Sequence, residues 1–159
     1  FKTDSDDFYA HKLMSAMFGG TPFSFLFANV REKLSLCYYC TAGIIECKQT
    51  MIVDSGIERE NVDKAKSEIL KQLKAISDGD FSDELLENTK KALCNGFQSN
   101  NDSVLALNSW YFVQRVRGNV NSPEQICDII QNISRERVIN SAKSFRLDTV
   151  YLMEPEVKE

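Results

Sequence analysis

The sequence contains no long hydrophobic run, no cluster of basic residues and only one histidine. No apolar stretch approaches the roughly 18 residues that a membrane-spanning helix needs, so we expect no membrane partner. The net charge of −4, without a lysine/arginine stripe, argues against a nucleic acid as partner. The first residues, FKTDSDD, form neither a signal peptide nor a transit peptide.

The single histidine, His11, lies in the stretch DFYAHKLM. Zinc catalysis needs about three protein ligands and an open coordination position. One imidazole, without a second histidine or a suitably spaced carboxylate, cannot supply them. The sequence therefore predicts no metal site in this chain, and a surface or partly packed His11.

The cysteines are few, odd in number and widely spaced, namely Cys37, Cys40, Cys47, Cys94 and Cys127. This usage is typical of a reducing cytosol, where thiols behave as small apolar residues, and we expect a cytoplasmic protein. Cys37 and Cys40 have the spacing of redox and zinc pairs. Because residues three apart in a regular strand point to opposite faces, we expect the two thiols to diverge.

The 159 residues are enough for one domain, 1–159, with one core. Hydrophobic periodicity and capping residues predict helices ending at Gly19-Gly20 and near Leu34, then helices over 61–77, from Ser82, over 105–117, from Ser122 and from Ser134. The first helix would be capped by Asp4 or Ser5. Strands are expected at 36–45 and 49–55, which would form a hairpin, and at 148–153, which would close the chain.

This order predicts an α+β fold, an antiparallel sheet with helices packed on one face. It corresponds to the β-α-β-β-α-β split βαβ pattern with its first strand missing. Residues before Phe1 would supply that strand, and because the chain does not start with Met we expect a fragment of a longer protein. Without that strand the sheet would expose an extra edge, through which a homodimer could form.

The most informative stretch is 18–39, FGGTPFSFLFANVREKLSLCYY. Its double glycine would make a turn between two helices, in which glycine allows positive φ. The alternative is that backbone amides at the start of the following helix hold an anion such as phosphate, but the stretch matches a phosphate-binding loop only weakly.

Arg31 and Tyr38 lie on either side of the predicted helix-to-strand junction in this stretch. A guanidinium is a rigid fork of donors and a phenol offers one hydroxyl, a pair that suits recognition of peptide carbonyls. Arg31 could instead complement the helix dipole or pair with Glu32. Tyr39 should face the other side of the strand.

The double glycine, the SFLF helix and REKLSLCY entering a strand resemble the second, non-catalytic domain of the pitrilysin/insulinase family of zinc metallopeptidases, most closely its YmfF-type bacterial members. The similarity continues through SRERV at 134–138 and covers almost the entire chain. The resemblance implies a LuxS/MPP-like metallohydrolase fold. It also implies that Arg31 and Tyr38 contact the substrate backbone near a zinc ion that a homologous half binds through H-x-x-E-H.

No H-x-x-E-H occurs in this chain, so the resemblance implies a domain that is inactive alone and has no catalytic residue. Zinc would lie only in a partner domain or a paralogue subunit, and in YmfF-type members both halves can lack zinc ligands. We expect a non-catalytic, substrate-binding domain of a zinc-dependent peptidase (a hydrolase), which supplies Arg31 and Tyr38 to a peptide-binding chamber. The alternative is a structural or assembly domain of a peptidase-like protein with no proteolytic role.

Overall fold

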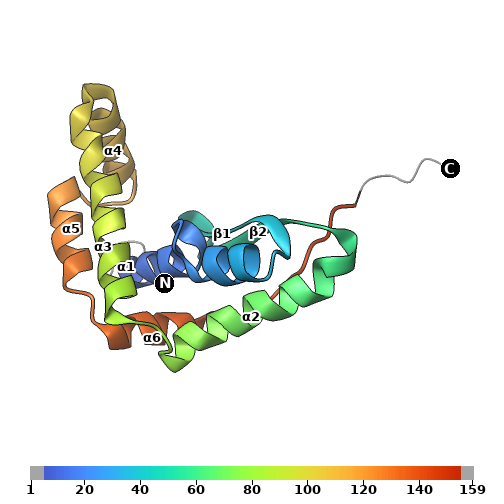
Figure 1. Ribbon diagram of the computed structural model, residues 1–159. Coiled ribbons are helices and arrows are strands. Elements are labelled where there is room, and N and C mark those ends of the chain that lie inside the picture. The colour runs from blue at the N-terminus through green and yellow to red at the C-terminus, as the bar shows by residue number, and fades with distance from the viewer. Residues whose placement is uncertain (1–5, 155–159) are drawn as a thin grey trace.

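The computed structural model describes residues 6–154, in which helices pack against one small sheet (Figure 1). The predicted caps Asp4 and Ser5 lie outside these residues. The label η denotes a π-helix (η1 and η2) or a 3₁₀-helix (η3, η4 and η5). In chain order the elements are α1 (Asp6–Ser15), η1 (Ala16–Gly20), η2 (Leu26–Lys33), β1 (Cys37–Ile45), η3 (Glu46–Lys48), β2 (Thr50–Ile57), η4 (Arg59–Asn61), α2 (Val62–Asp78), α3 (Asp83–Gln98), η5 (Ser99–Asp102), α4 (Val104–Val116), α5 (Pro123–Gln131) and α6 (Arg135–Ser144). None of the helices in the described part of the chain is both long and apolar enough to cross a membrane.

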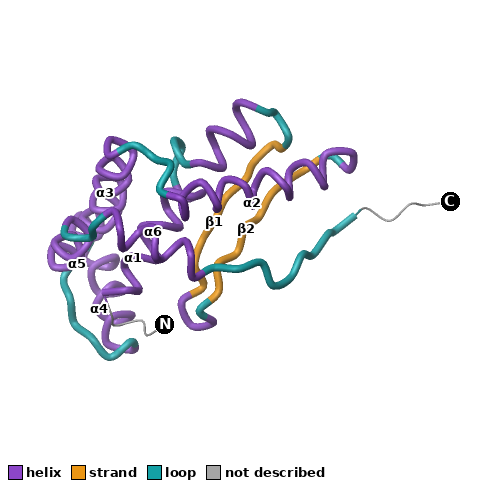
Figure 2. The backbone as a smooth tube through the Cα atoms, turned by 90° about the horizontal axis from the view of Figure 1, so that it is seen from below, coloured by secondary structure: helices purple, strands orange, loops and turns teal. Residues whose placement is uncertain are grey.

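The two strands form the predicted antiparallel hairpin, whose register pairs Ala42 with Val53. Its inward face packs on the core through alternate residues of both strands, and its outward face leaves Ile52 47% exposed. Figure 2 shows α2 crossing in front of the hairpin. The sheet with helices on one face confirms the predicted α+β class. Large apolar side chains from α1, η1, η2, α2, α5 and α6 fill the core: Phe8, Leu13, Met14, Met17, Phe18, Leu26, Val30, Ile76, Ile126, Ile130 and Val138.

A bulge between Cys37 and Tyr39 interrupts the hairpin register. Cys37 and Cys40 both pack toward the core and interact with each other, so the predicted divergence of the two thiols is wrong. Alternation of side chains holds only for a regular strand, and one extra residue shifts a side chain to the other face. Burial raises the pKa of the Cys40 thiol to about 11, which makes it a poor nucleophile.

Gly19 allows η1 to approach β1 closely. A Cβ atom at this position would lie 2.5 Å from the backbone nitrogen of Ala42. The φ angle of Gly19 is −153°, and Gly20 also lacks a positive φ. The prediction that these glycines provide positive φ is therefore wrong, since what requires Gly19 is contact between two backbones.

Serine side chains begin the helices α3, α5 and α6, as predicted. Ser82 accepts a hydrogen bond from the backbone of the first turn of α3, and Ser134 does the same for α6. Ser122 and Gln125 form a complete capping box at α5. Such caps satisfy backbone N–H groups that have no partner inside the helix, which is why they mark helix starts in the sequence.

The predicted closing strand at 148–153 is not a strand within the described structure. Residues 146–154 make no backbone hydrogen bond to another segment of residues 6–154. Figure 2 shows this stretch leaving α6 and running past the β2 side of the hairpin without joining it. A strand needs a neighbour for its N–H and C=O groups, and no described segment provides one here.

Candidate functional site

The turn between η2 and β1 separates Arg31 from Tyr38. Ser35 in this turn has a left-handed φ of 50°. Its N–H donates to the carbonyl of Arg31, and the N–H of Leu36 donates to the carbonyl of Val30, each at 3.1 Å. A left-handed conformation costs a residue with a Cβ about 1–2 kcal/mol, and such strain often occurs at functional sites.

Arg31 lies in the last turn of η2, with its side chain 40% exposed. Its Nη1 is 3.4 Å from Glu32 Oε1, so the pairing with Glu32 that the sequence allowed is present. The guanidinium carbon lies 4.6 Å from the centroid of the Phe27 ring. Stacking of this kind uses the flat face of the guanidinium and leaves the in-plane N–H groups as donors.

Tyr38 is 73% exposed at the bulge of β1. Its hydroxyl donates to Glu58 Oε1 at 2.9 Å, and Glu58 directly follows β2. This hydrogen bond, together with the negative charge of Glu58, raises the pKa of Tyr38. Both effects favour the protonated phenol, so Tyr38 is a neutral hydrogen-bond donor.

Tyr39 has the same chemistry with another partner. Its hydroxyl donates to Asp54 Oδ2 at 3.2 Å, and this contact raises its pKa in the same way. Its ring lies against β2, because a Cβ at Gly56 would be 2.8 Å from Tyr39 Cε1. Tyr39 is therefore a natural reference for Tyr38: a neighbouring phenol that is also bound to an acid.

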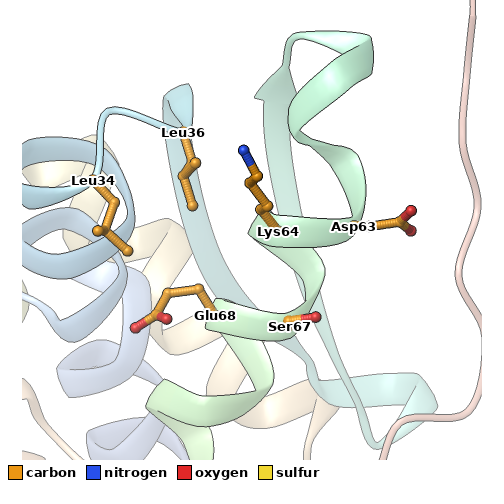
Figure 3. Close-up of a pocket in the computed structure, with 6 residues that line it drawn as sticks. All are labelled: Leu34, Leu36, Asp63, Lys64, Ser67 and Glu68. Atoms are coloured by element: carbon orange, nitrogen blue, oxygen red, sulfur yellow. The ribbon is translucent and has the colours of Figure 1, made fainter.

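A pocket of about 470 Å³ lies beside the junction (Figure 3). It is mainly apolar on the side of the junction and polar on the side of α2. Figure 3 shows Leu34 and Leu36 turned toward the first turns of α2, with Glu68 extending toward Leu34 and Lys64 toward Leu36. The lining residues are Leu34, Leu36, Asp63, Lys64, Ser67 and Glu68.

Hydrogen bonds connect the α2 side of the pocket to η2. Asn29 of η2 donates to the side-chain oxygen of Gln72 at 2.8 Å, and Gln72 donates to Glu68. Gln72 is only 7% exposed, so an unpaired amide there would be costly. Since Asn29 precedes Arg31 by two residues, the chain of bonds links the end of η2 to α2.

Arg31 and Tyr38 lie at the two ends of one junction, but no hydrogen bond or ion pair joins them within the described residues. Arg31 pairs with Glu32, and Tyr38 donates to Glu58. No pattern in the sequence points to Glu58, which lies 20 residues beyond Tyr38. Only the pairing of β1 with β2 brings it near, and a bulge at this point is not visible in the pattern of residues.

Comparison with known proteins shows the family. Residues 2–93 match the family model described as the Peptidase M16 inactive domain. The chain belongs to this M16 inactive-domain family. It is also 34% identical over 148 residues to “Probable inactive metalloprotease YmfF” of Bacillus subtilis (strain 168), a match that covers 92% of this chain and 34% of that protein. The resemblance stated from the sequence is confirmed.

Solved structures share the M16 fold. A conserved protein from Enterococcus faecalis V583 superposes with a TM-score of 0.82 at 27% identity, over 90% of this chain and 34% of that one. A protease from Helicobacter pylori superposes with a TM-score of 0.78 at 15% identity, over 89% of this chain and 35% of that one. The chain thus spans about a third of the length of these relatives.

The side chains that the structure describes in this M16 domain do not fit a zinc ion. Among residues 6–154 no group of three or more His, Cys, Asp or Glu side chains could hold a metal. His11 is buried, with Nδ1 2.6 Å from Ser141 Oγ and its ring edge-on to Phe145; the sequence allowed a surface or a partly packed histidine, and the structure packs it. Zinc needs several such ligands together, so we assign no step in this chain to a metal.

Proposed function

We propose that this M16 inactive domain is the non-catalytic, substrate-binding half of a peptidase-type chamber, in which Arg31 and Tyr38 donate hydrogen bonds to a peptide substrate. The observation that carries this proposal is the junction between η2 and β1. It presents two exposed donors, and the residues between them, Leu34 and Leu36, line a pocket. Donors to the peptide backbone with a pocket for a side chain are the usual parts of a peptide-binding site.

The chemistry of the pair suits a carbonyl oxygen that becomes more negative during hydrolysis. The Arg31 guanidinium is charged at every relevant pH, and the raised pKa of Tyr38 keeps its hydroxyl protonated. Hydrogen bonds from fixed donors strengthen as charge develops on the acceptor. One such donor is typically worth about 3 kcal/mol in the transition state.

Hydrolysis itself would require a homologous zinc-bearing domain or a paralogue subunit, because no group of residues in the described chain suits a metal. The lengths of the relatives support such a division. This chain spans 34% of YmfF, which leaves room in a longer protein for further domains of this kind. A peptide and a zinc-bearing homologue are therefore the partners we propose.

The test uses the longer protein that contains this chain, purified together with its zinc-bearing partner. Arg31→Ala and Tyr38→Phe should each lower kcat/KM for a peptide substrate by about a hundredfold. Lys33→Ala, in the same turn of η2, and Tyr39→Phe are the matched controls and should leave kcat/KM unchanged. Thermal unfolding of each variant checks that the domain remains folded, and wild-type turnover in both test variants would contradict the proposal.

The second candidate is a structural or assembly domain with no proteolytic role. It is favoured by the acids that already hold the two donors, Glu32 at Arg31 and Glu58 at Tyr38, since this arrangement needs no ligand. A complex with the zinc-bearing partner that cleaves peptides equally well with wild-type and doubly substituted (Arg31→Ala, Tyr38→Phe) domains would support this alternative.

A further inference from the structure

The pocket beside the junction contains a carboxylate that is held in one position. Glu68 of α2 lines this pocket, and its side chain is only 15% exposed. Gln72 donates a hydrogen bond to Glu68 Oε1, and Asn29 of η2 donates to Gln72 in turn. A side chain that is fixed before a ligand arrives loses little conformational freedom when the ligand binds.

The pocket has an apolar floor with one charge at each end. Figure 3 shows Glu68 extending toward Leu34 and Lys64 extending toward Leu36. The carboxylate of Asp63 also belongs to the lining, but it points away from both leucines. Lys64 and Glu68 are one helical turn apart, yet no ion pair joins them in the part of the chain that the structure describes. Each of the two charges therefore remains able to act on a ligand in the pocket.

The cation that already contacts Glu68 leaves room for another one. Lys71 Nζ lies 3.4 Å from Glu68 Oε2, and the Lys71 side chain is 73% exposed. An exposed ion pair of this kind contributes little, and a carboxylate has about four lone-pair sites for hydrogen bonds. Glu68 can therefore accept hydrogen bonds from a ligand cation while it keeps the one from Gln72.

We propose that this pocket binds a lysine or arginine side chain of the peptide, and that Glu68 is the residue that selects it. The aliphatic stem of such a side chain can lie on Leu34 and Leu36 while its charged end reaches Glu68. A hydrogen bond between two charged groups is stronger than one between neutral groups, and partial burial of the acid strengthens it further.

The proposal rests on the proposed function, which supplies the peptide and its position. Leu34 and Leu36 lie in the chain between Arg31 and Tyr38 and line the pocket. A peptide whose backbone is held by these two donors presents a side chain to the pocket between them, as in other sites that combine backbone hydrogen bonds with side-chain pockets. An acidic side chain bound by Lys64 is the competing occupant.

Peptide binding measures the selectivity of the pocket. The longer protein that contains this chain is purified with its zinc-bearing partner, and a chelator removes the zinc so that peptides bind without being cleaved. Fluorescence polarisation then gives Kd for blocked alanine peptides that carry a single arginine, leucine or glutamate. We expect the arginine peptide to bind at least about tenfold more tightly than the other two, because only its side chain donates charge-assisted hydrogen bonds to Glu68. Equal affinities, a preference for leucine or glutamate, or no binding of any peptide would overturn the proposal.

A pair of substitutions on α2 identifies the residue that selects the side chain. Glu68→Gln keeps an acceptor for Gln72 but removes the charge, so the arginine peptide should bind no better than the leucine peptide. Lys64→Gln is the matched control and removes the opposing cation, so it should preserve or increase the preference for arginine. An unchanged preference in Glu68→Gln, or its loss in Lys64→Gln, would overturn the role of Glu68. Thermal unfolding checks that both variants remain folded.

The double variant Arg31→Ala, Tyr38→Phe separates this proposal from the proposed function. It should weaken the binding of all three peptides by the same factor, because donors to the backbone do not distinguish side chains. If it does so while the wild type binds the three peptides equally, only the selectivity of the pocket is wrong. If it changes no affinity while Glu68 still selects arginine, the role of Arg31 and Tyr38 is wrong and the selectivity stands.

Discussion

The Tyr38 hydroxyl donates a 2.9 Å hydrogen bond to Glu58, so the start of β1 is connected to the end of β2, close in the chain to Leu34 and Leu36, which line the pocket. The Tyr38 hydroxyl has one hydrogen, and it donates this hydrogen to Glu58 instead of to a substrate carbonyl. Binding of a peptide at Tyr38 would have to displace this acid, which makes Glu58 the natural competitor of a ligand at this position.

Removal of the charge of Glu58 should change the titration of Tyr38. In Glu58→Gln the pKa of Tyr38 should fall toward its ordinary value, because the hydrogen bond to Glu58 and its charge are what raise it. Spectrophotometric titration measures this shift, with Tyr38→Phe identifying the signal among the five tyrosines. Asp54→Asn is the control and should shift Tyr39 instead; identical curves for wild type and Glu58→Gln would show that the contact is absent in solution.

Gly19→Ala should destabilise the domain, because the new methyl group would lie 2.5 Å from the backbone of Ala42. Overpacking of this kind typically costs about 1–3 kcal/mol. Gly96→Ala is the matched control: its Cβ would meet nothing within 4 Å inside α3, and it should gain up to about 1 kcal/mol. Urea unfolding of both variants measures the difference, and equal midpoints would refute the close approach of η1 and β1.

Arg135 connects α6 to the loop between α2 and α3. Its guanidinium contacts Asp83 at 2.7 Å and the carbonyl of Gly79 at 2.6 Å, and it stacks on Phe81 at 4.0 Å. Because lysine cannot reproduce this fork and stacking, Arg135→Lys should lower the free energy of unfolding by about 2 kcal/mol.

Arg59→Lys is the control for Arg135, since the Arg59 side chain is 79% exposed and has one surface ion pair. Surface substitutions of this kind usually change stability by no more than about 0.5 kcal/mol. Chemical denaturation compares the two variants, and an equally small effect of Arg135→Lys would show that its contacts contribute little.

The titration of His11 should report its burial. Burial of the ring lowers its pKa, and the nearby charge of Asp7 offsets only part of this effect. As the only histidine in the chain, it gives a single Hε1 resonance in proton NMR, and the pKa read from this resonance should lie below 6.5.

The same shift predicts how stability depends on pH. The unfolded chain takes up a proton at His11 as the pH falls below 6.5, whereas the folded chain does so only at a lower pH. The free energy of unfolding should therefore decrease across this window as pH falls. In His11→Gln this part of the dependence should disappear, and a His11 pKa at or above 6.5 would contradict the prediction.

Local signals in the sequence predicted most of the elements correctly. Helix periodicity and serine caps depend on residues within one or two turns of each other, so Ser82, Ser122 and Ser134 could be identified without any tertiary information. The hairpin followed from two runs of strand-forming residues separated by a short turn. The predictions for Gly19 and for the Cys37–Cys40 pair were wrong. Gly19 depends on a contact with a distant backbone segment, and the cysteine pair depends on a bulge, and no local pattern of residues reveals either.

By itself, the sequence determined the α+β class, the family and the positions of Arg31 and Tyr38, because these depend on local periodicity and on a contiguous motif. Only the tertiary structure decided what surrounds that pair, namely Glu58 at Tyr38 and the pocket formed with α2. It also decided that 148–153 has no backbone partner among residues 6–154. Each of these involves segments far apart along the chain. Their approach depends on how whole elements pack and pair, and the free energy of that packing is a property of the fold rather than of any short stretch of residues.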